Sequence, residues 1–223
     1  MNQEQALSLL KETKLVAILR GIPVKQATDI ATALYDGGVR VLEFTFDHDD
    51  PDCVAHNCQR IRAVKKIFGD EMVVGCGTAL TVQEVEASVE AGGQIVISPN
   101  VDVSVIAKTK ALGAISMPGA LTPTEIVMAY NAGADIVKLF PAGPLGVPYI
   151  KAVRGPLGYI PMSAVGGVRP ETIADFLNAG VCGFGVGGEL VKKEFVRSGD
   201  MNALTSRARK FVHAIEQWEA NRS

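Results

Sequence analysis

Short apolar runs rich in Val, Ile and Leu recur along the whole chain, and between them lie longer stretches in which apolar residues return at a helical spacing. A short apolar run bounded by turn residues is typical of a buried strand, whereas apolar residues at positions i, i+3 and i+4 predict an amphipathic helix. We therefore expect strand and helix to alternate, with strands near residues 15 to 19, 40 to 45, 72 to 76, 94 to 98, 114 to 117, 135 to 139, 160 to 164 and 181 to 185.

The residues at the junctions support these boundaries. Glycines that can end a helix stand before five of the runs, at Gly38, Gly93, Gly113, Gly133 and Gly180. Helix starts are indicated at residues 81–84, 122–125 and 169–172. Eight strand–helix units predict a single (β/α)8 barrel domain over residues 1–223. The reversal of order that a doubly wound sheet needs is missing, as is the Leu and Asn spacing of a leucine-rich solenoid.

Composition narrows the class of protein. The 223 residues are 48% hydrophobic and 21% charged, which suits one domain with a large core. The net charge is -2 and no stretch concentrates Lys and Arg, so we expect a small-molecule partner and neither nucleic acid nor a membrane surface. The N-terminus has no basic start or long apolar run, which favours the cytoplasm. Cysteines 53, 58, 76 and 182 lack the spacing of a zinc site and are expected to be reduced, mostly packed thiols.

Lys138 is the strongest candidate for chemistry, because it lies in the apolar run 135–142, where an ammonium group is costly. Removal from water lowers the pKa of a lysine, and a neutral amine attacks ketones to form a Schiff base. A lysine at a strand end that reaches solvent is the alternative. Glu43 is a second polar residue in an apolar strand, and alternation places it on the same inward face as Val41 and Thr45. It could then meet Lys138, either as a catalytic partner or as a structural ion pair.

In a barrel, the chemistry lies where strands end and the βα loops begin. The expected site residues at these ends are Arg20, Thr78, Pro99, Pro118, Phe140 and the glycine pairs Gly166-Gly167 and Gly187-Gly188. Paired glycines after the last two strands expose backbone N–H groups and predict a phosphate site, while Arg20 and Thr78 can hold a second anion such as a carboxylate.

A metal site could be proposed only in the acidic segment 47–52, with His56 beyond it. We favour a capping role, with Asp50 as the N-cap and Pro51 as the first residue of the following helix, and Asp52 complementing the helix dipole. No metal or other cofactor is therefore expected.

Seven motifs together resemble the bacterial 2-keto-3-deoxy-6-phosphogluconate (KDPG) and 4-hydroxy-2-oxoglutarate aldolases and their 6-phosphogalactonate relatives. The motifs follow the family's order nearly end to end: 16–21 (VAILRG), 42–45 (LEFT), 75–78 (GCGT), 97–100 (ISPN), 117–119 (MPG), 137–142 (VKLFPA) and 165–168 (VGGV). The resemblance implies a metal-independent class I aldolase, usually a homotrimer of (β/α)8 subunits. Such an enzyme cleaves a 2-keto-3-deoxy sugar acid phosphate to pyruvate and glyceraldehyde 3-phosphate.

The same resemblance assigns roles to individual residues. It implies that Lys138 forms the Schiff base and that Glu43 is the general acid and base. Thr78 falls near the pyruvyl carboxylate, Pro99 and Phe140 line the pocket, and Gly166-Gly167 falls on the phosphate loop.

Three positions depart from the gluconate-type pattern. Asp47 replaces an Arg that is common four residues after the catalytic Glu, so Arg20 is expected to take over its anion contact. Val165 replaces a common Thr, which is more like the phosphogalactonate type, and Gly188 replaces a common phosphate-binding Ser. A phosphate-binding isomerase and a non-catalytic barrel that binds sugar acids are alternatives, but neither requires a strand lysine that faces a glutamate.

Overall fold

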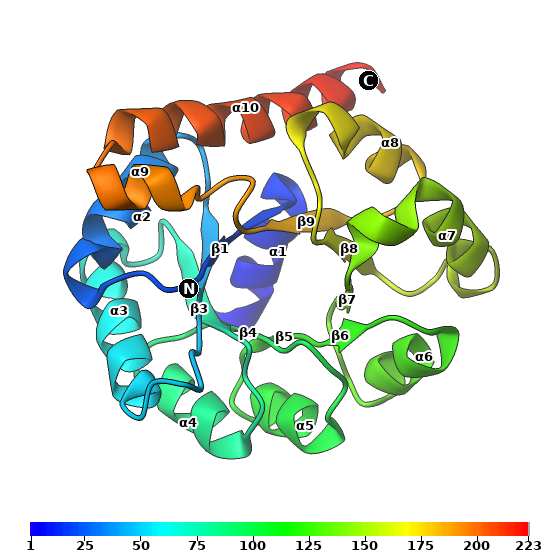
Figure 1. Ribbon diagram of the computed structural model, residues 1–223. Helices are drawn as coiled ribbons and strands as arrows, with labels where there is room; N and C mark the ends of the chain where they lie inside the picture. Colours follow the sequence, from blue (N-terminus) through cyan, green and yellow to red (C-terminus); the bar gives the residue numbers. More distant parts are fainter. Residues whose placement is uncertain (223) are drawn as a thin grey trace.

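A computed structural model describes residues 1–222 and shows a barrel of parallel strands surrounded by helices (Figure 1). The strands are β1 (Leu15–Leu19), β2 (Val41–Thr45), β3 (Val73–Gly77), β4 (Ile95–Ile97), β5 (Ile115–Met117), β6 (Gly119–Ala120), β7 (Val137–Leu139), β8 (Met162–Val165) and β9 (Gly183–Val186). Their order around the barrel is β5-β4-β3-β2-β1-β9-β8-β7-β6, with every pairing parallel. The (β/α)8 prediction is confirmed.

The strand expected at residues 114 to 117 is divided in two by Pro118. The first part, β5, pairs with β4, and the second part, β6, pairs with β7. Proline has no N–H to donate to a ladder, which explains why the segment changes partner at this residue. Among the described residues no ladder joins β5 to β6, so the barrel is closed by the chain itself at this point.

The helices cover the outside of the barrel and follow the strands in turn. They are α2 (Ala27–Asp36), α3 (Cys53–Phe68), α4 (Val82–Glu90), α5 (Val103–Ala111), α6 (Pro123–Asn131), α7 (Ala142–Leu157), α8 (Ile173–Asn178), α9 (Lys193–Ser198) and α10 (Met201–Ala220), with short 3-10 turns η1 (Val24–Gln26) and η2 (Pro170–Thr172). Apolar side chains between the strands and this helical layer form the larger core cluster. No helix in the described part of the chain is long and apolar enough to span a bilayer.

Local capping agrees with the sequence at most helix ends. Thr81 and Thr122 each form a capping box with the glutamate three residues later. The third expected start, at Arg169, first forms η2 before α8 begins. The left-handed residue that leads into β4 is Gly92 and not Gly93, because α4 ends at its C-cap Ala91 and the turn follows at once.

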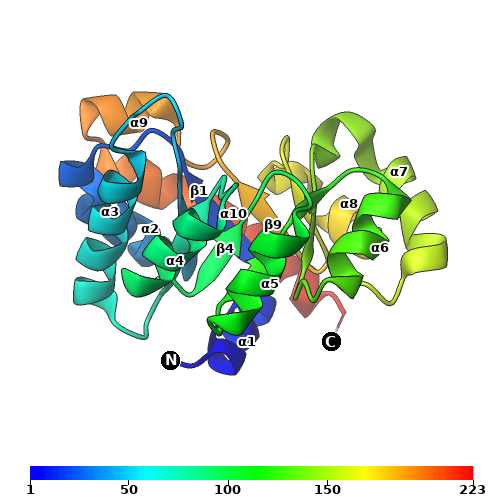
Figure 2. The same cartoon turned by 90° about the horizontal axis from the view of Figure 1, so that it is seen from below.

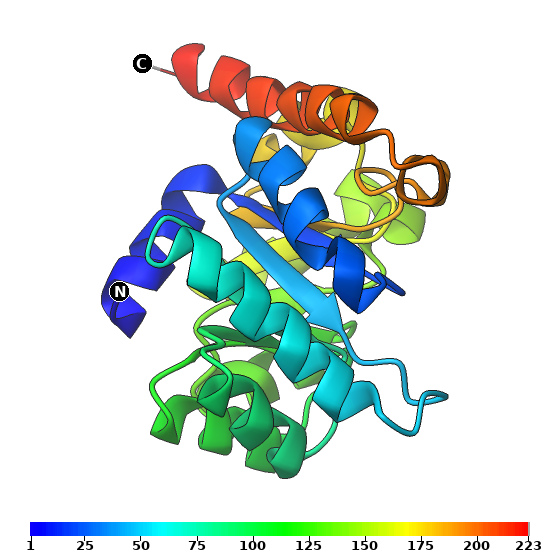
Figure 3. The same cartoon turned by 90° about the vertical axis from the view of Figure 1, so that its left-hand side faces the viewer.

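Helix α1 (Gln3–Thr13) precedes the first strand and was not predicted. It lies across one end of the barrel (Figure 2), and its buried residues Ala6 and Leu10 join the inner cluster formed by Val16, Val41 and other strand residues. The strands run away from α1 toward the end where the long loops and α9 lie, as β2 shows in Figure 3. Helix α1 therefore covers the N-terminal end of the barrel, where it packs against the interior side chains of the strands.

The four cysteines carry free thiols. Cys58 and Cys76 are buried, and Cys53 and Cys182 are half-buried. Burial raises the pKa of the Cys76 thiol to about 12, so this group stays protonated. The expectation of packed, reduced thiols agrees with this arrangement.

Candidate active site

Glu43 occupies the middle of β2 and points into the barrel. Its register partners are Ile18 on β1 and Gly75 on β3, and its side chain is 1% exposed. Alternation along the strand puts Val41 and Thr45 on the same face, as expected. A carboxylate in the interior needs a space that the surrounding side chains do not fill.

Gly77, at the end of β3, provides that space. A methyl group at position 77 would lie 1.7 Å from Oε2 of Glu43, so only glycine leaves room for the carboxylate. Within the described structure, Oε2 has no hydrogen-bond partner. Burial raises the pKa of Glu43 to about 7, an effect that the positive charges of Lys138 and Arg20 partly oppose. This carboxyl group therefore changes its protonation state near neutral pH.

Lys138 lies on β7, on the opposite side of the same cavity. Its backbone N–H donates to the carbonyl of Pro118 at 2.9 Å. Lys138 is only 7% exposed, so the alternative that its side chain extends into solvent is excluded. Nζ lies 4.9 Å from the centre of the Phe140 ring. Burial lowers the pKa of Lys138, the Glu43 carboxylate opposes this, and the Arg20 guanidinium lowers the pKa further.

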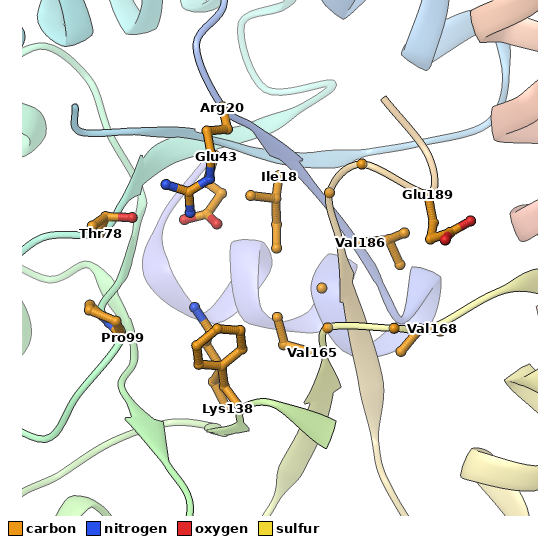
Figure 4. Close-up of a pocket in the computed structure, with 16 residues that line it drawn as sticks. Ile18, Arg20, Glu43, Thr78, Pro99, Lys138, Val165, Val168, Val186 and Glu189 are labelled. Atoms are coloured by element: carbon orange, nitrogen blue, oxygen red, sulfur yellow. The ribbon is translucent and has the colours of Figure 1, made fainter. Parts of the chain in front are cut away.

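The two groups face each other without forming a direct ion pair. In residues 1–222, no carboxylate oxygen lies within 4 Å of the Lys138 amine. In Figure 4 the amine points toward Glu43 and Arg20 across the cavity. The alternative of a structural salt bridge is not what the geometry shows: each group is open to the space between them, where a small molecule would fit.

This space is a cavity of about 270 Å³ at the C-terminal ends of the strands. It is lined by ten of the residues expected from the sequence, namely Arg20, Glu43, Thr78, Pro99, Lys138, Phe140, Gly166, Gly167, Gly187 and Gly188. Pro118 is the exception, because it is buried beside the cavity and contributes only the carbonyl that holds Lys138. The expected gathering of strand-end residues around one site is thus observed for all but one of them.

Two of the lining segments have left-handed backbone. Thr78 has φ +58°, an uncommon conformation for a residue with a branched side chain. The turn at Gly166-Gly167 also has positive φ and packs closely on the start of α7, where the Gly143 N–H donates to the Gly166 carbonyl at 2.7 Å. Nothing in the sequence around Thr78 indicates its strained backbone.

Six further residues complete the lining: Ile18, Val165, Val168, Gly185, Val186 and Glu189. Ile18 lies beside Glu43 in the register of β1 and β2, so its side chain also points into the barrel. The alternation of side chains along β1 could have predicted this. Glu189 is the one charged residue that the sequence reasoning missed, although it directly follows the Gly187-Gly188 pair. Its carboxylate lies at the far end of the cavity from Thr78 and Pro99 (Figure 4).

The acidic segment 47–52 does not gather into a metal site. In the described part of the chain, no group of three or more His, Cys, Asp or Glu side chains is placed to hold a metal ion. The expected cap was wrong in its position: α3 begins at Cys53, and its N-cap, Asp52, makes no side-chain capping bond. Asp50 instead accepts from the Asp52 N–H at 3.0 Å and contacts Nδ1 of His56 at 2.7 Å, because residues 50–53 form a separate turn before the helix.

The burial of Glu43 predicts a pH-dependent stability. Between its ordinary pKa of 4.5 and about 7, the folded protein keeps a proton that the unfolded chain releases, so the free energy of unfolding falls as pH rises through this range. Between pH 5 and pH 8, ionisation of Glu43 should lower the free energy of unfolding of the unchanged protein by about 2 to 3 kcal/mol. We expect the Glu43→Gln variant not to show this decrease. Urea unfolding of both proteins at the two pH values measures it, and parallel pH profiles would contradict it.

The comparisons with known proteins agree with this geometry. A family model described as KDPG and KHG aldolase matches residues 7–207. A probable 2-dehydro-3-deoxy-6-phosphogalactonate aldolase of Rhizobium meliloti (strain 1021) is 37% identical over 81% of this chain and 83% of its own. The KHG/KDPG aldolase of Escherichia coli (strain K12) is 32% identical over 95% of this chain and 96% of its own.

A solved structure described as native KDPGal superposes with a TM-score of 0.83 at 33% identity, covering 92% of this chain and 96% of that one. The residues that the family model matches include every strand that carries a site residue. The chain therefore belongs to the KDPG and KHG aldolase family, and it is an aldolase, a carbon–carbon lyase.

Proposed function

We propose that this aldolase is a class I enzyme in which Lys138 is the Schiff-base nucleophile and Glu43 is the proton carrier. The single observation that carries the proposal is the pairing of a buried amine of lowered pKa with a buried carboxyl of raised pKa across one cavity. An isomerase or a binding barrel has no use for such a pair, because only carbonyl chemistry at an amine needs both.

The first steps need a neutral amine. Burial and the nearby Arg20 guanidinium disfavour the charged form of Lys138, so its lone pair is available to attack the C2 ketone of a 2-keto acid. Glu43 then donates a proton to the carbinolamine hydroxyl, which leaves as water and gives the iminium. A carboxyl with a pKa of about 7 can make this donation near neutral pH and be regenerated afterwards.

The bond cleavage uses the iminium as an electron sink. Glu43, now ionised, accepts the C4 hydroxyl proton, the C3–C4 bond breaks, and its electrons form the enamine while the aldehyde leaves. Glu43 returns the proton to C3, and water hydrolyses the pyruvyl iminium to release pyruvate and free Lys138. One carboxyl group can serve these steps in turn because each step leaves it in the protonation state that the next step requires.

The remaining lining residues divide between the two ends of the substrate. Thr78 and Arg20 are placed to bind the carboxylate of the pyruvyl half, with Arg20 replacing the anion contact that Asp47 cannot make. Pro99 and Phe140 form the apolar walls beside Lys138. The glycine pairs 166–167 and 187–188 line the part of the cavity that receives the aldehyde half.

We propose 2-keto-3-deoxy-6-phosphogalactonate as the preferred substrate, with the gluconate isomer and 4-hydroxy-2-oxoglutarate as poorer ones. Two observations support this order. Relatives named as phosphogalactonate aldolases, from Rhizobium meliloti and Escherichia coli, are 37% and 35% identical, whereas the KHG/KDPG aldolase is 32% identical. Val165 and Asp47 also depart from the gluconate-type pattern.

Pyruvate release from each purified sugar acid, followed with lactate dehydrogenase and NADH, tests this function. We expect pyruvate from both phosphorylated isomers, a higher kcat/KM for the galactonate, and no effect of EDTA. Absence of pyruvate from both isomers would contradict the assignment. Loss of activity in EDTA with recovery on adding a divalent ion would replace the Schiff base with a metal mechanism.

A change at Gly77 tests whether the space for Glu43 is needed. The Gly77→Ala methyl group would displace the Glu43 carboxylate, since the two would lie 1.7 Å apart. We expect kcat to fall about 10²-fold, as for other misplaced acid–base groups. Gly155→Ala is the matched control, because no atom lies within 4 Å of its new methyl group. Equal kcat values for the two variants, in a pyruvate-release assay, would refute the role of Gly77.

We further propose a homotrimer that acts in the cytoplasm. Several large apolar side chains are exposed on the single chain, among them Val103, Met128 and Tyr130 on α5 and α6, and a subunit interface would cover such residues. Sedimentation equilibrium should give three times the 23.6 kDa of one chain, and a monomer at micromolar concentration would contradict this.

A further inference from the structure

Thr78 lines the active-site cavity although its backbone is left-handed. A φ of +58° costs free energy in a residue with a branched side chain, so it persists only where neighbouring contacts fix the chain. In Figure 4 the Thr78 side chain points into the cavity, toward Arg20 and Glu43. A loop that relaxed to the ordinary backbone conformation would turn this side chain elsewhere. The contacts that hold the neighbouring residues therefore decide whether Thr78 is ready to bind a ligand.

Hydrogen bonds fix the backbone on both sides of this left-handed residue. Before and after it, the Gly77 carbonyl and the Ala79 N–H bond to the neighbouring strand segments at 2.8 and 3.2 Å. The next two N–H groups, of Leu80 and Thr81, both donate to Oε2 of Glu84, at 2.6 and 3.0 Å. One side chain on α4 therefore holds the two peptide groups that lead away from the cavity.

Glu84 is 5% exposed, and both of its carboxylate oxygens have partners. Its own N–H donates to Oγ1 of Thr81 at 3.2 Å, which completes the capping box at the start of α4. Its second oxygen, Oε1, lies 2.7 Å from Nε2 of His48, in the loop after β2. An imidazole N–H donates to a carboxylate at this distance. The contact joins the loop that follows the Glu43 strand to the loop that carries Thr78.

A second Thr–Glu capping box, at the start of α6, provides a comparison. There the N–H groups of Leu121 and Thr122 donate to Oε2 of Glu125 at 2.8 and 2.7 Å, so the backbone bonds are the same. None of residues 119–137 lines the cavity. In the part of the chain that the structure describes, no histidine contacts Glu125. Of these two boxes, the one beside the active site has the additional contact.

We propose that Glu84, braced by His48, is a positioning residue that holds Thr78 in the left-handed conformation that binds the substrate carboxylate. Glu84 does not line the cavity, so it acts through the backbone of residues 80 and 81. The contact with His48 keeps its carboxylate turned toward these N–H groups. The ligand is the carboxylate of pyruvate or of the pyruvyl half of the sugar acid. This inference rests on the proposed function, which assigns that carboxylate to Thr78.

The KM for pyruvate, in aldol addition to glyceraldehyde 3-phosphate, tests this role. We expect Glu84→Ala to raise this KM at least about tenfold while kcat stays within about threefold, because the carboxylate contact is made equally in the ground state and the transition state. Glu125→Ala is the matched control, since it removes the same two backbone bonds at α6, and it should keep the KM. Glu84→Gln, whose amide oxygen can still accept from both N–H groups, should keep the KM within about threefold.

A cycle with Thr78→Ala separates positioning from a general loss of stability. Thr78→Ala alone should raise the KM for pyruvate as Glu84→Ala does. Adding Glu84→Ala to it should then change the KM by less than about twofold, because Glu84 acts through Thr78. His48→Ala leaves the capping box intact and should raise the KM about threefold, since the carboxylate loses only its brace.

Three results would overturn the inference. Equal KM values for Glu84→Ala and Glu125→Ala would make Glu84 an ordinary helix cap. The same rise in KM on adding Glu84→Ala to Thr78→Ala would mean that Glu84 acts by another route. An unchanged KM in His48→Ala would remove His48 from the device. Failure of the proposed function is recognised separately, because the intact protein would then form no borohydride-reduced pyruvyl adduct on Lys138, and that result would overturn both proposals.

Discussion

The Lys138→Met variant is expected to lose pyruvate release, with kcat lower by about 10⁴-fold or more, the range found when an enzyme loses its nucleophile. Met has a similar length and no amine, so the cavity keeps its walls while the Schiff base cannot form. The expected loss is large because every step from carbinolamine to hydrolysis passes through this nitrogen. The measurement is kcat for the sugar acid phosphate, followed by coupled pyruvate detection.

Stability separates this loss from misfolding. Burial disfavours the charged amine of Lys138, and its replacement by an apolar side chain of similar volume removes that cost. The variant should therefore unfold at an equal or higher urea concentration than the unchanged protein. Lys151→Met, at an exposed position on α7, is the matched control and should keep full activity. More than a tenth of the original kcat in Lys138→Met would contradict the assigned nucleophile.

The Glu43→Gln variant is expected to lower kcat by about 10² to 10⁴-fold, the usual contribution of a positioned acid–base group. The amide keeps the shape of the carboxyl group in the space above Gly77, but it cannot carry protons. In the unchanged protein, kcat/KM should fall as the pH rises above about 7, because the first proton transfer needs protonated Glu43 in the free enzyme and its pKa is about 7. That limb should be missing from the profile of the variant.

A pH series from 5 to 9 for both proteins measures this effect. Glu171→Gln, an exposed glutamate on η2, is the control and should keep both the rate and the limb. An unchanged limb near pH 7 in Glu43→Gln would assign the titration to another group, and an unchanged kcat would remove Glu43 from the mechanism.

Much of the fold could be predicted from the sequence, because strand and helix patterns alternate with clear turn residues between them. The division of the fifth strand could not, since it depends on Pro118 meeting two different neighbours in the closed barrel. Helix α1 was missed although Asn2 and Gln5 form a capping box at its start, whereas the end of the barrel that it covers could not be predicted from the sequence.

In the candidate site, too, some residues could be predicted from the sequence and others could not. Lys138 and Glu43 could be found because a charged residue within an apolar strand can be recognised from the sequence alone. The need for glycine at position 77 appears only when β2 and β3 lie side by side, with Glu43 Oε2 where a side chain would be. Glu189 was also missed, since its place in the lining depends on how the loop after β9 turns toward the cavity.

The most direct test of the Schiff-base mechanism is reduction with sodium borohydride in the presence of pyruvate, followed by peptide mass spectrometry. We expect a stable pyruvyl adduct on Lys138, absent from Lys138→Met and from samples without pyruvate. An unmodified Lys138, under conditions that label another class I aldolase, would contradict the Schiff-base mechanism.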